Sequence, residues 1–377
     1  MPSILLARVG VSAVFFINGF SFASWAPRLA GVKARLALDE AELGLALFGI
    51  ACGALLAMLA TGALATRLGS RLVTTVALVL YLLTPIPWAV APSLTTLALG
   101  FIAIGITAGA LDVAMNAQAV AVERQAGRAI LNSFHALFSL GGMTGALVTA
   151  GVVALEVPLL AHMIIVAAVG LPVGLFACRA MLPAAFDPGA EGPSFALPSR
   201  GLLAIGAIAF GALLIEGAVG DWSAVYVTES LAGERWLAAV AFAAFQLAMA
   251  SMRFAGDQLV ERFGPVRVAA AGGGVAAAGL GLALVIGQPL AAILGFTAVG
   301  IGMAAIFPIT ISVAAARGDM APGNAIAAIA TLGYTGFLVG PPTIGALADL
   351  TRLPLALGLL PLLALMIALL SPCLRRA

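Results

Sequence analysis

Apolar stretches long enough to cross a bilayer recur along almost the whole chain. A spanning helix needs about 20 apolar residues. Two charge-free runs are too long for one span: 72–111 breaks at Pro85 and Pro87, and 268–316 breaks at Gly287–Pro289. The remaining runs predict helices over about 9–27, 43–66, 129–155, 158–180, 201–226, 236–254, 324–348 and 353–373. The pattern therefore predicts an all-α membrane protein with twelve transmembrane helices.

Composition supports this interpretation and excludes several classes of protein. Of 377 residues, 63% are hydrophobic and 9% charged, whereas a soluble domain carries about 25% charged residues. The 44 glycines and 20 prolines favour packed and broken helices over a β-barrel. A net charge of +2 gives no reason to expect nucleic acid as a partner. The three cysteines lie far apart and suit neither a disulfide framework nor a metal site, so we expect no metal and no cofactor.

The placement of basic residues predicts the orientation. Thirteen of the 18 Lys and Arg residues, Arg253 among them, fall on the side that holds both termini. The other side has Arg28, Lys33, Arg35, Arg235 and Arg352. By the positive-inside rule both termini are cytoplasmic, which predicts a multi-pass protein of a bacterial inner membrane. The four tryptophans, Trp25, Trp88, Trp222 and Trp236, fall at outer helix ends, where we expect an aromatic belt facing the interface.

A proline- and glycine-containing polar stretch at 183–199 lies at the midpoint of the chain. Its composition is typical of a linker. It separates two six-helix halves, 1–182 and 200–377, and predicts a cytoplasmic connection between two bundles.

The two halves repeat each other. Leu-x-x-Arg-x-Gly occurs in 62–69 and again in 257–264, at an offset of 195 residues, and each copy is followed by another Arg. Ile17–Gly19 and Ile215–Gly217 match at an offset of 198. Two matches on either side of a central linker indicate a duplicated transporter with two parallel-related halves.

These features resemble the major facilitator superfamily, whose loop between helices 2 and 3 reads roughly Gly-x-Leu-Ala-Asp-Arg-x-Gly-Arg-Arg. The resemblance implies two pseudo-symmetric six-helix bundles and assigns gating to this loop and its twin, at Arg67, Gly69, Arg71, Asp257, Glu261, Arg262 and Gly264. Thr66 stands where the family has an acid, and Glu261 stands at that place in the second copy. A simple topological role for Arg67 and Arg71 stays open.

A narrower resemblance points to the proton-coupled, fucose-permease-like branch. Leu111–Asn116 is similar to its helix 4, Leu131–Phe134 to the start of its helix 5, and Gly340–Gly345 to its helix 11. Helix 1 has no counterpart of the branch's other key acid, so fucose itself is not implied.

Two acids inside apolar helices are the candidates for proton coupling. A carboxylate in hydrocarbon costs about 2.5–3.5 kcal/mol on insertion scales, so it normally faces a cavity or a partner. Asp112 has Asn116 one turn further along the same face. Glu216 occupies the pseudo-symmetric place of Asn18. The alternative for Asp112 is a structural acid satisfied by Asn132 or a helix end.

Other polar residues on apolar helices are candidates for solute binding: Asn18, Asn116, Asn132, His135, Gln246 and Tyr334. Asn132 and His135 share a face, since three residues separate them. Interhelical hydrogen bonding is the alternative role for each.

We therefore expect a secondary active transporter, not an enzyme, that moves a small polar solute with protons by alternating access. The bilayer, the solute and protons are its expected partners, and we expect a monomer. Efflux of drugs or metabolites by proton antiport is the alternative within this class. A membrane-embedded enzyme or a sensor that does not transport is the alternative outside it.

Overall fold

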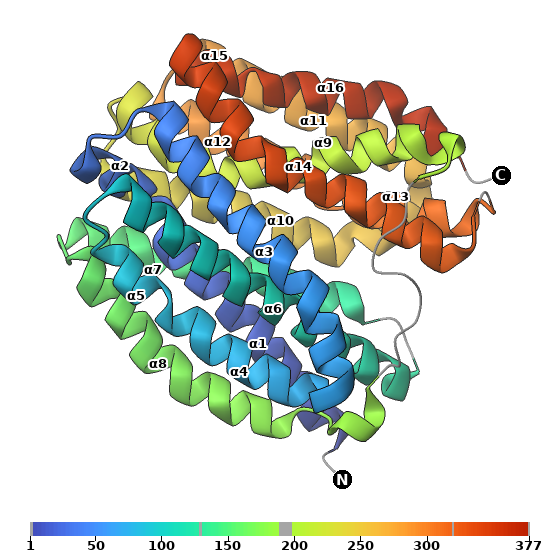
Figure 1. Cartoon of the computed structure of the whole chain (residues 1–377). Coiled ribbons are helices and arrows are strands. Elements are labelled where there is room, and N and C mark those ends of the chain that lie inside the picture. The colour runs from blue at the N-terminus through green and yellow to red at the C-terminus, as the bar shows by residue number, and fades with distance from the viewer. Residues whose placement is uncertain (1–2, 128–129, 188–197, 319, 376–377) are drawn as a thin grey trace. The chain divides into compact units, whose positions relative to one another are not determined.

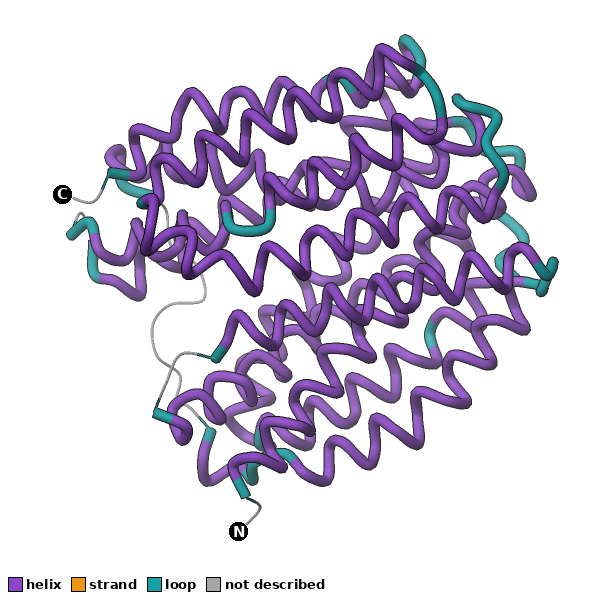
Figure 2. Tube along the Cα trace, turned by 180° about the vertical axis from the view of Figure 1, so that it is seen from behind, coloured by secondary structure: helices purple, strands orange, loops and turns teal. Residues whose placement is uncertain are grey.

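The structure is a computed structural model, and it describes residues 3–127, 130–187, 198–318 and 320–375. Every regular element in these residues is a helix (Figure 2). Twelve stretches among them are long and apolar enough to cross a membrane, which confirms the predicted all-α class and span number. The chain divides into two compact units, Met1–Leu38 with Leu45–Ala190, and Asp39–Gly44 with Glu191–Ala377.

The first unit holds the helices of the N-terminal half, drawn from blue to green in Figure 1. They are α1 (Ile4–Trp25), α2 (Leu29–Leu36), α3 (Glu40–Leu68), α4 (Ser70–Leu83), α5 (Pro85–Ala89), α6 (Leu94–Ala126), α7 (Leu131–Ala154) and α8 (Leu159–Ala180), with short 3₁₀ turns at Ala26–Arg28 and Ala184–Phe186. The first turn of α3 groups with the second unit. Within the first unit α8 runs alongside α4 (Figure 1).

Glycines bring α1 and α7 into backbone contact. A Cβ on Gly19 would fall on the backbone carbonyl of Phe138, and one on Gly141 would fall on that of Phe16. Small residues allow this close approach, which is a main source of helix association in membranes. The contact fixes α1 and α7 as one rigid pair.

The predicted aromatic belt is wrong for three of the four tryptophans. Trp25, Trp88 and Trp222 are 1% exposed or less, and only Trp236 is substantially exposed, at 37%. Trp25 packs on Trp88 with ring centroids 5.7 Å apart. The sequence places these residues correctly along the helix axis, but it does not say which face of each helix turns toward lipid. The exposed large hydrophobic side chains are instead mainly Leu, Ile and Val.

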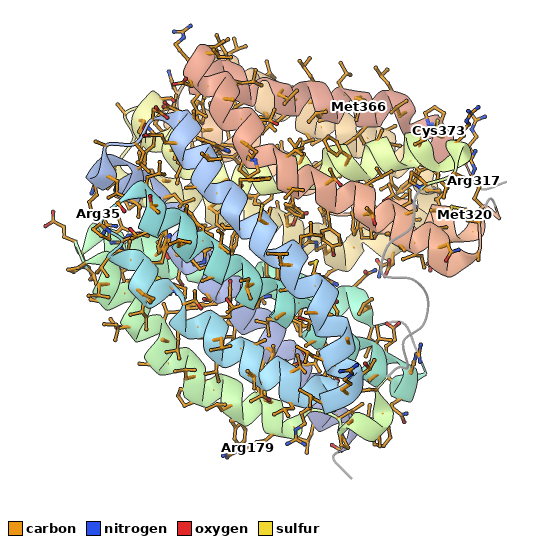
Figure 3. All side chains as sticks on the ribbon, viewed as in Figure 1. Arg35, Arg179, Arg317, Met320, Met366 and Cys373 are labelled. Carbon is orange, nitrogen blue, oxygen red and sulfur yellow. The ribbon has the colours of Figure 1, made fainter. Side chains whose placement is uncertain are left out.

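The second unit holds the C-terminal helices, drawn from yellow-green to red in Figure 1. They are α9 (Leu203–Val225), a π-helical turn (Tyr226–Ser230), α10 (Arg235–Phe263), α11 (Pro265–Ile286), α12 (Pro289–Met303), α13 (Ile306–Ala316), α14 (Pro322–Leu350), α15 (Leu353–Leu357) and α16 (Leu359–Leu370), with 3₁₀ turns at Arg200–Leu202 and Ser371–Leu374. Arg317 at the end of α13 donates from Nη1 to the carbonyl of Cys373 at 3.2 Å, and the two lie side by side in Figure 3.

In this unit the structure agrees with one predicted span boundary and differs from another. The predicted break between two spans occurs at Gly287, which has a positive φ of 62°. The predicted end of the eighth span near residue 254 is wrong, because α10 continues to Phe263. Hydropathy ends a span at the first charges, whereas a helix continues through them when they find partners or water.

Candidate functional site

Asp112 lies in the interior of α6, a helix of 33 residues that begins with a capping box formed by Ser93 and Thr96. Asn116 donates from Nδ2 to the Asp112 backbone carbonyl at 2.9 Å and to Oδ1 of its carboxylate at 3.1 Å. Both side chains are half-buried. Within the described part of the chain no Lys, Arg or His forms a salt bridge with Asp112. Within these residues the acid therefore has a neutral partner from its own helix and no counter-ion.

Asn18 of α1 approaches α6 next to this acid. Its side chain is buried, and Nδ2 lies 3.7 Å from Sδ of Met115, the residue before Asn116. The structure thus brings Asn18 to the same level of the first unit as the Asp112–Asn116 pair.

His135 and Asn132 lie at the start of α7 and are half-buried. The His135 ring meets the ring of Phe15 edge-on, with centroids 5.2 Å apart. Phe15 is three residues before Asn18, so one stretch of α1 contacts both α6 and α7. Among the predicted polar residues of the first unit, Asn18 and His135 therefore both lie in contacts made by this stretch of α1.

Glu123, at the end of α6, was not singled out by the sequence. Its Oε2 accepts hydrogen bonds from the backbone N–H groups of Ile130 and Leu131, both at 2.7 Å. A carboxylate at a helix N-terminus satisfies unpaired N–H groups and complements the helix dipole. An acid shortly before an apolar helix that lacks a capping residue is the signal that would have identified it.

In the second unit, Glu216 of α9 forms a salt bridge with Arg253 of α10. Nη2 of Arg253 lies 2.9 Å from Oε1 of Glu216, and the two side chains are 16% and 20% exposed. From the sequence, Arg253 is expected among the charges at the inner end of a span. This placement is wrong, because α10 extends ten residues beyond Arg253 and the guanidinium pairs with an acid inside the bundle.

Gln246 and Tyr334 are the other predicted solute contacts of this unit. Gln246 is buried and lies seven residues before Arg253, on the same face of α10. Tyr334 is 42% exposed, and its ring centroid is 6.1 Å from that of Phe307 in α13. The structure thus aligns Gln246 with the ion pair along α10 and places Tyr334 in an aromatic contact on α14.

Asp221 is a further half-buried acid in α9, five residues after Glu216. Among the described residues it has no salt bridge. The described residues also contain no group of three His, Cys, Asp or Glu side chains that could hold a metal ion.

The two loops that the sequence predicts to be gating loops share a backbone feature. Gly69 has φ 87° and precedes α4, and Gly264 has φ 80° and precedes α11. A positive φ is readily adopted by glycine alone, so each loop turns sharply at its glycine. The 195-residue repeat in the sequence is thus matched by the same turn. Of the other predicted gating residues, Arg67, Asp257, Glu261 and Arg262 are exposed, and Arg71 is half-buried.

An acid from a distant part of the chain reaches the loop in which position 66 lacks the family's acid. Within the described residues the Thr66 hydroxyl donates to the carbonyl of Ala63 in its own helix, at 2.9 Å. Asp187, which follows the last 3₁₀ turn of the first unit, accepts at Oδ2 from the N–H of Ser70 at 2.7 Å. Its Oδ1 accepts from the Ser70 hydroxyl. Spacing along the sequence gives no signal for this contact, because 117 residues separate the partners.

Comparison with known proteins assigns the chain to a family. Residues 11–341 match the Major Facilitator Superfamily. An uncharacterized MFS-type transporter of Yersinia pestis is 36% identical over 96% of this chain and 94% of its own. An uncharacterized transporter of Sinorhizobium fredii is 33% identical over the full length of both. The crystal structure of the nucleoside transporter NupG has a similar fold, with a TM-score of 0.75 at 14% identity over 98% of each chain. The chain therefore belongs to the major facilitator superfamily and is a membrane transporter.

Proposed function

We propose that this protein is a secondary active transporter that carries a small polar solute together with protons, and that Asp112 is the proton carrier. The observation that carries the proposal is the surroundings of this acid: a half-buried carboxylate inside a spanning helix with Asn116 as its hydrogen-bond donor. An ionised carboxylate in hydrocarbon costs about 2.5–3.5 kcal/mol, and a bound proton removes this cost. Asp112 can therefore gain and lose a proton as access alternates between the two sides.

Glu216 has a different role in this proposal. Arg253 already neutralises its charge at 2.9 Å, so a proton on Glu216 would break an ion pair rather than relieve an isolated charge. We therefore assign proton transfer to Asp112 and solute binding to the region around the Glu216–Arg253 pair. Asn18, Asn116, Asn132, His135, Gln246 and Tyr334 are the proposed further solute contacts.

The resemblance of Leu111–Asn116 to the fucose-permease-like branch supports symport rather than antiport. The excess of arginines on the side of the termini supports an inner-membrane protein with both termini in the cytoplasm. We propose that it acts as a monomer, with 1–182 and 200–377 as its two bundles. Residues 188–197 of the predicted linker lie outside the described residues.

The experiment begins with a thermal-shift screen of purified protein against sugars, polyols, nucleosides and small carboxylates, because a bound solute stabilises the folded state. Hits are tested in proteoliposomes that contain a pH-sensitive dye. We expect solute-dependent proton entry in the wild type. Asp112→Asn should abolish proton-driven accumulation but retain counterflow exchange, since an amide cannot carry a proton.

Asp112→Glu is the matched control, because it keeps a carboxyl group, and it should retain part of the accumulation. Wild-type accumulation by Asp112→Asn would refute the role of this acid. Solute uptake without proton movement in the wild type would refute proton coupling, while leaving transport established.

A further inference from the structure

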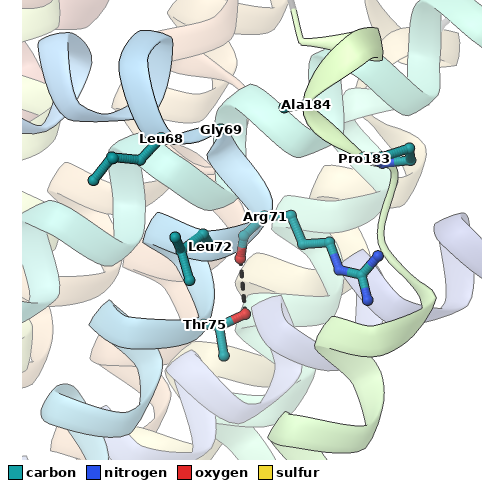
Figure 4. Close-up of a pocket in the computed structure, with 7 residues that line it drawn as sticks. All are labelled: Leu68, Gly69, Arg71, Leu72, Thr75, Pro183 and Ala184. Carbon is teal, nitrogen blue, oxygen red and sulfur yellow. Dashed lines mark hydrogen bonds between the residues drawn. The ribbon is translucent and has the colours of Figure 1, made fainter.

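A cavity of about 300 Å³ opens in the first unit between the start of α4 and the residues that follow α8 (Figure 4). It is lined by Leu68, Gly69, Arg71, Leu72, Thr75, Pro183 and Ala184. The Thr75 hydroxyl donates to the backbone carbonyl of Arg71 at 2.7 Å (Figure 4). The Arg71 guanidinium is the charged group of the lining. The cavity thus combines one positive charge with mostly apolar walls.

One wall of the cavity is held in place by a buried hydrogen-bond network. Gln118 of α6 is 0% exposed, donates to the Leu182 carbonyl at 3.0 Å and accepts from the Leu182 N–H at 3.1 Å. The same amide nitrogen donates to the Ser70 hydroxyl at 2.7 Å. The segment that begins at Leu182 ends at Asp187, whose carboxylate accepts hydrogen bonds from Ser70. Pro183 and Ala184, which lie between these two anchors, therefore form a preorganised wall.

The position of the cavity suits the headgroup depth of a membrane. Arg71 is in the first turn of α4, at the end of a span. Leu68 and Leu72 beside it are 55% and 52% exposed, so their side chains are accessible to acyl chains. Within the described residues Arg71 forms no salt bridge, and both oxygens of Asp187 are occupied by Ser70. A guanidinium at this depth recognises a phosphate through paired N–H donors.

We infer that this cavity binds the headgroup of an anionic membrane phospholipid. Arg71 donates to the lipid phosphate, and the acyl chains follow Leu68 and Leu72 toward the hydrocarbon. Basic pockets between transmembrane helices are known to take anionic headgroups in this manner. Because the wall opposite Arg71 is the segment that leads out of the first unit, a bound lipid would also hold that segment against α4.

The test is native mass spectrometry of the purified full-length protein titrated with phosphatidylglycerol, with phosphatidylcholine, or with inorganic phosphate. We expect phosphatidylglycerol to bind in preference to phosphatidylcholine, and Arg71→Gln to weaken its binding about tenfold, because a charge-assisted hydrogen bond is lost. Arg267→Gln is the matched control: it removes the exposed arginine that follows the second copy of the loop and should leave the affinity unchanged.

Ala184→Phe provides a second variant that fills the cavity and keeps every charge, and it should also weaken phosphatidylglycerol binding. Thermal unfolding in phosphatidylcholine alone verifies that each variant is folded. Equal binding of the two lipids, or unchanged phosphatidylglycerol binding in both folded variants, would overturn the inference. Displacement of the lipid by millimolar inorganic phosphate would identify a site for the free ion instead.

Discussion

The Glu216–Arg253 ion pair gives a prediction whose size follows from the structure. We consider Arg253→Gln, which removes the guanidinium and leaves Glu216 inside the second unit without its counter-ion. Removing one partner of a fully buried pair costs about 3–5 kcal/mol, because the remaining charge is left uncompensated. The side chains of this pair are 16% and 20% exposed, so water reaches them in part. We therefore expect a loss somewhat below this range, about 2–3 kcal/mol.

The loss should appear as a fall in the unfolding temperature of about 5–10 °C, given about 2–4 °C per kcal/mol for a unit of this size. The double variant Glu216→Gln with Arg253→Gln removes both charges and should recover most of the stability. A double-mutant cycle then gives the coupling energy of the pair directly. Arg235→Gln, an exposed arginine at the start of the same helix, is the matched control and should change stability by less than about 0.5 kcal/mol.

The measurement is thermal unfolding of the wild type, Glu216→Gln, Arg253→Gln, the double variant and Arg235→Gln, all purified in one detergent and followed by tryptophan fluorescence. A coupling energy below about 0.5 kcal/mol would refute the assignment of a structural ion pair, since it would mean that the charges do not depend on each other. A double variant less stable than either single variant would refute it as well.

Further predictions concern the turns and helix contacts. Gly69→Ala should destabilise the protein more than Gly264→Ala. Both substitutions place a side chain at positive φ, at a cost of about 1–2 kcal/mol, but only the new Cβ at position 69 would meet another Cβ 2.7 Å away. Equal unfolding temperatures of the two variants would contradict this prediction. Glu123→Ala should cost about 1–2 kcal/mol through loss of the cap of α7, measurable as faster proteolysis near residue 130; an unchanged cleavage rate would count against it. Gly141→Ala should cost about 1–3 kcal/mol, whereas Gly151→Ala in the same helix, with open space around it, should be neutral or stabilising.

Sequence alone predicts the fold because its signals are local. Each span is a run of apolar residues, and the break at Gly287 is indicated by the neighbouring proline. The rotation of each helix about its axis depends on its neighbours, and the buried Trp25 and Trp88 show how this information is lost. The same limit explains the error at Arg253: a charge after a long apolar run looks like the end of a span until its partner is known.

The candidate site is predictable in part for the same reason. Asp112 and Glu216 are identified as acids in apolar helices. The one-turn spacing between Asp112 and Asn116 predicts that these two residues share a face of α6, and the structure adds a hydrogen bond between them. Arg253 and Asp187 could not be placed, because each meets its partner across a long separation in sequence. Contacts of this kind require the packing of the helices to be known.

The two copies of the repeat distribute their acids differently. At the 198-residue offset that relates Asn18 to Glu216, Asp112 corresponds to Thr310, a buried residue whose hydroxyl donates to the carbonyl of Phe307 at 2.7 Å. Within the described residues, Asp112 of the first unit therefore has no counter-ion, whereas Glu216 of the second unit is paired with Arg253. If proton transfer depends on Asp112 and solute binding depends on the Glu216–Arg253 pair, as we propose, the two kinds of variant must fail differently.

Asp112→Asn should lose accumulation and retain exchange, because only the proton is affected. Arg253→Gln should lose accumulation and exchange together, because the solute site itself is disturbed. Both activities are measured in the same proteoliposomes, with the stability of each protein determined beforehand so that unfolding does not imitate a loss of function. Identical losses in two equally folded variants would mean that proton and solute share one site, and the separate roles of Asp112 and the Glu216–Arg253 pair would have to be abandoned.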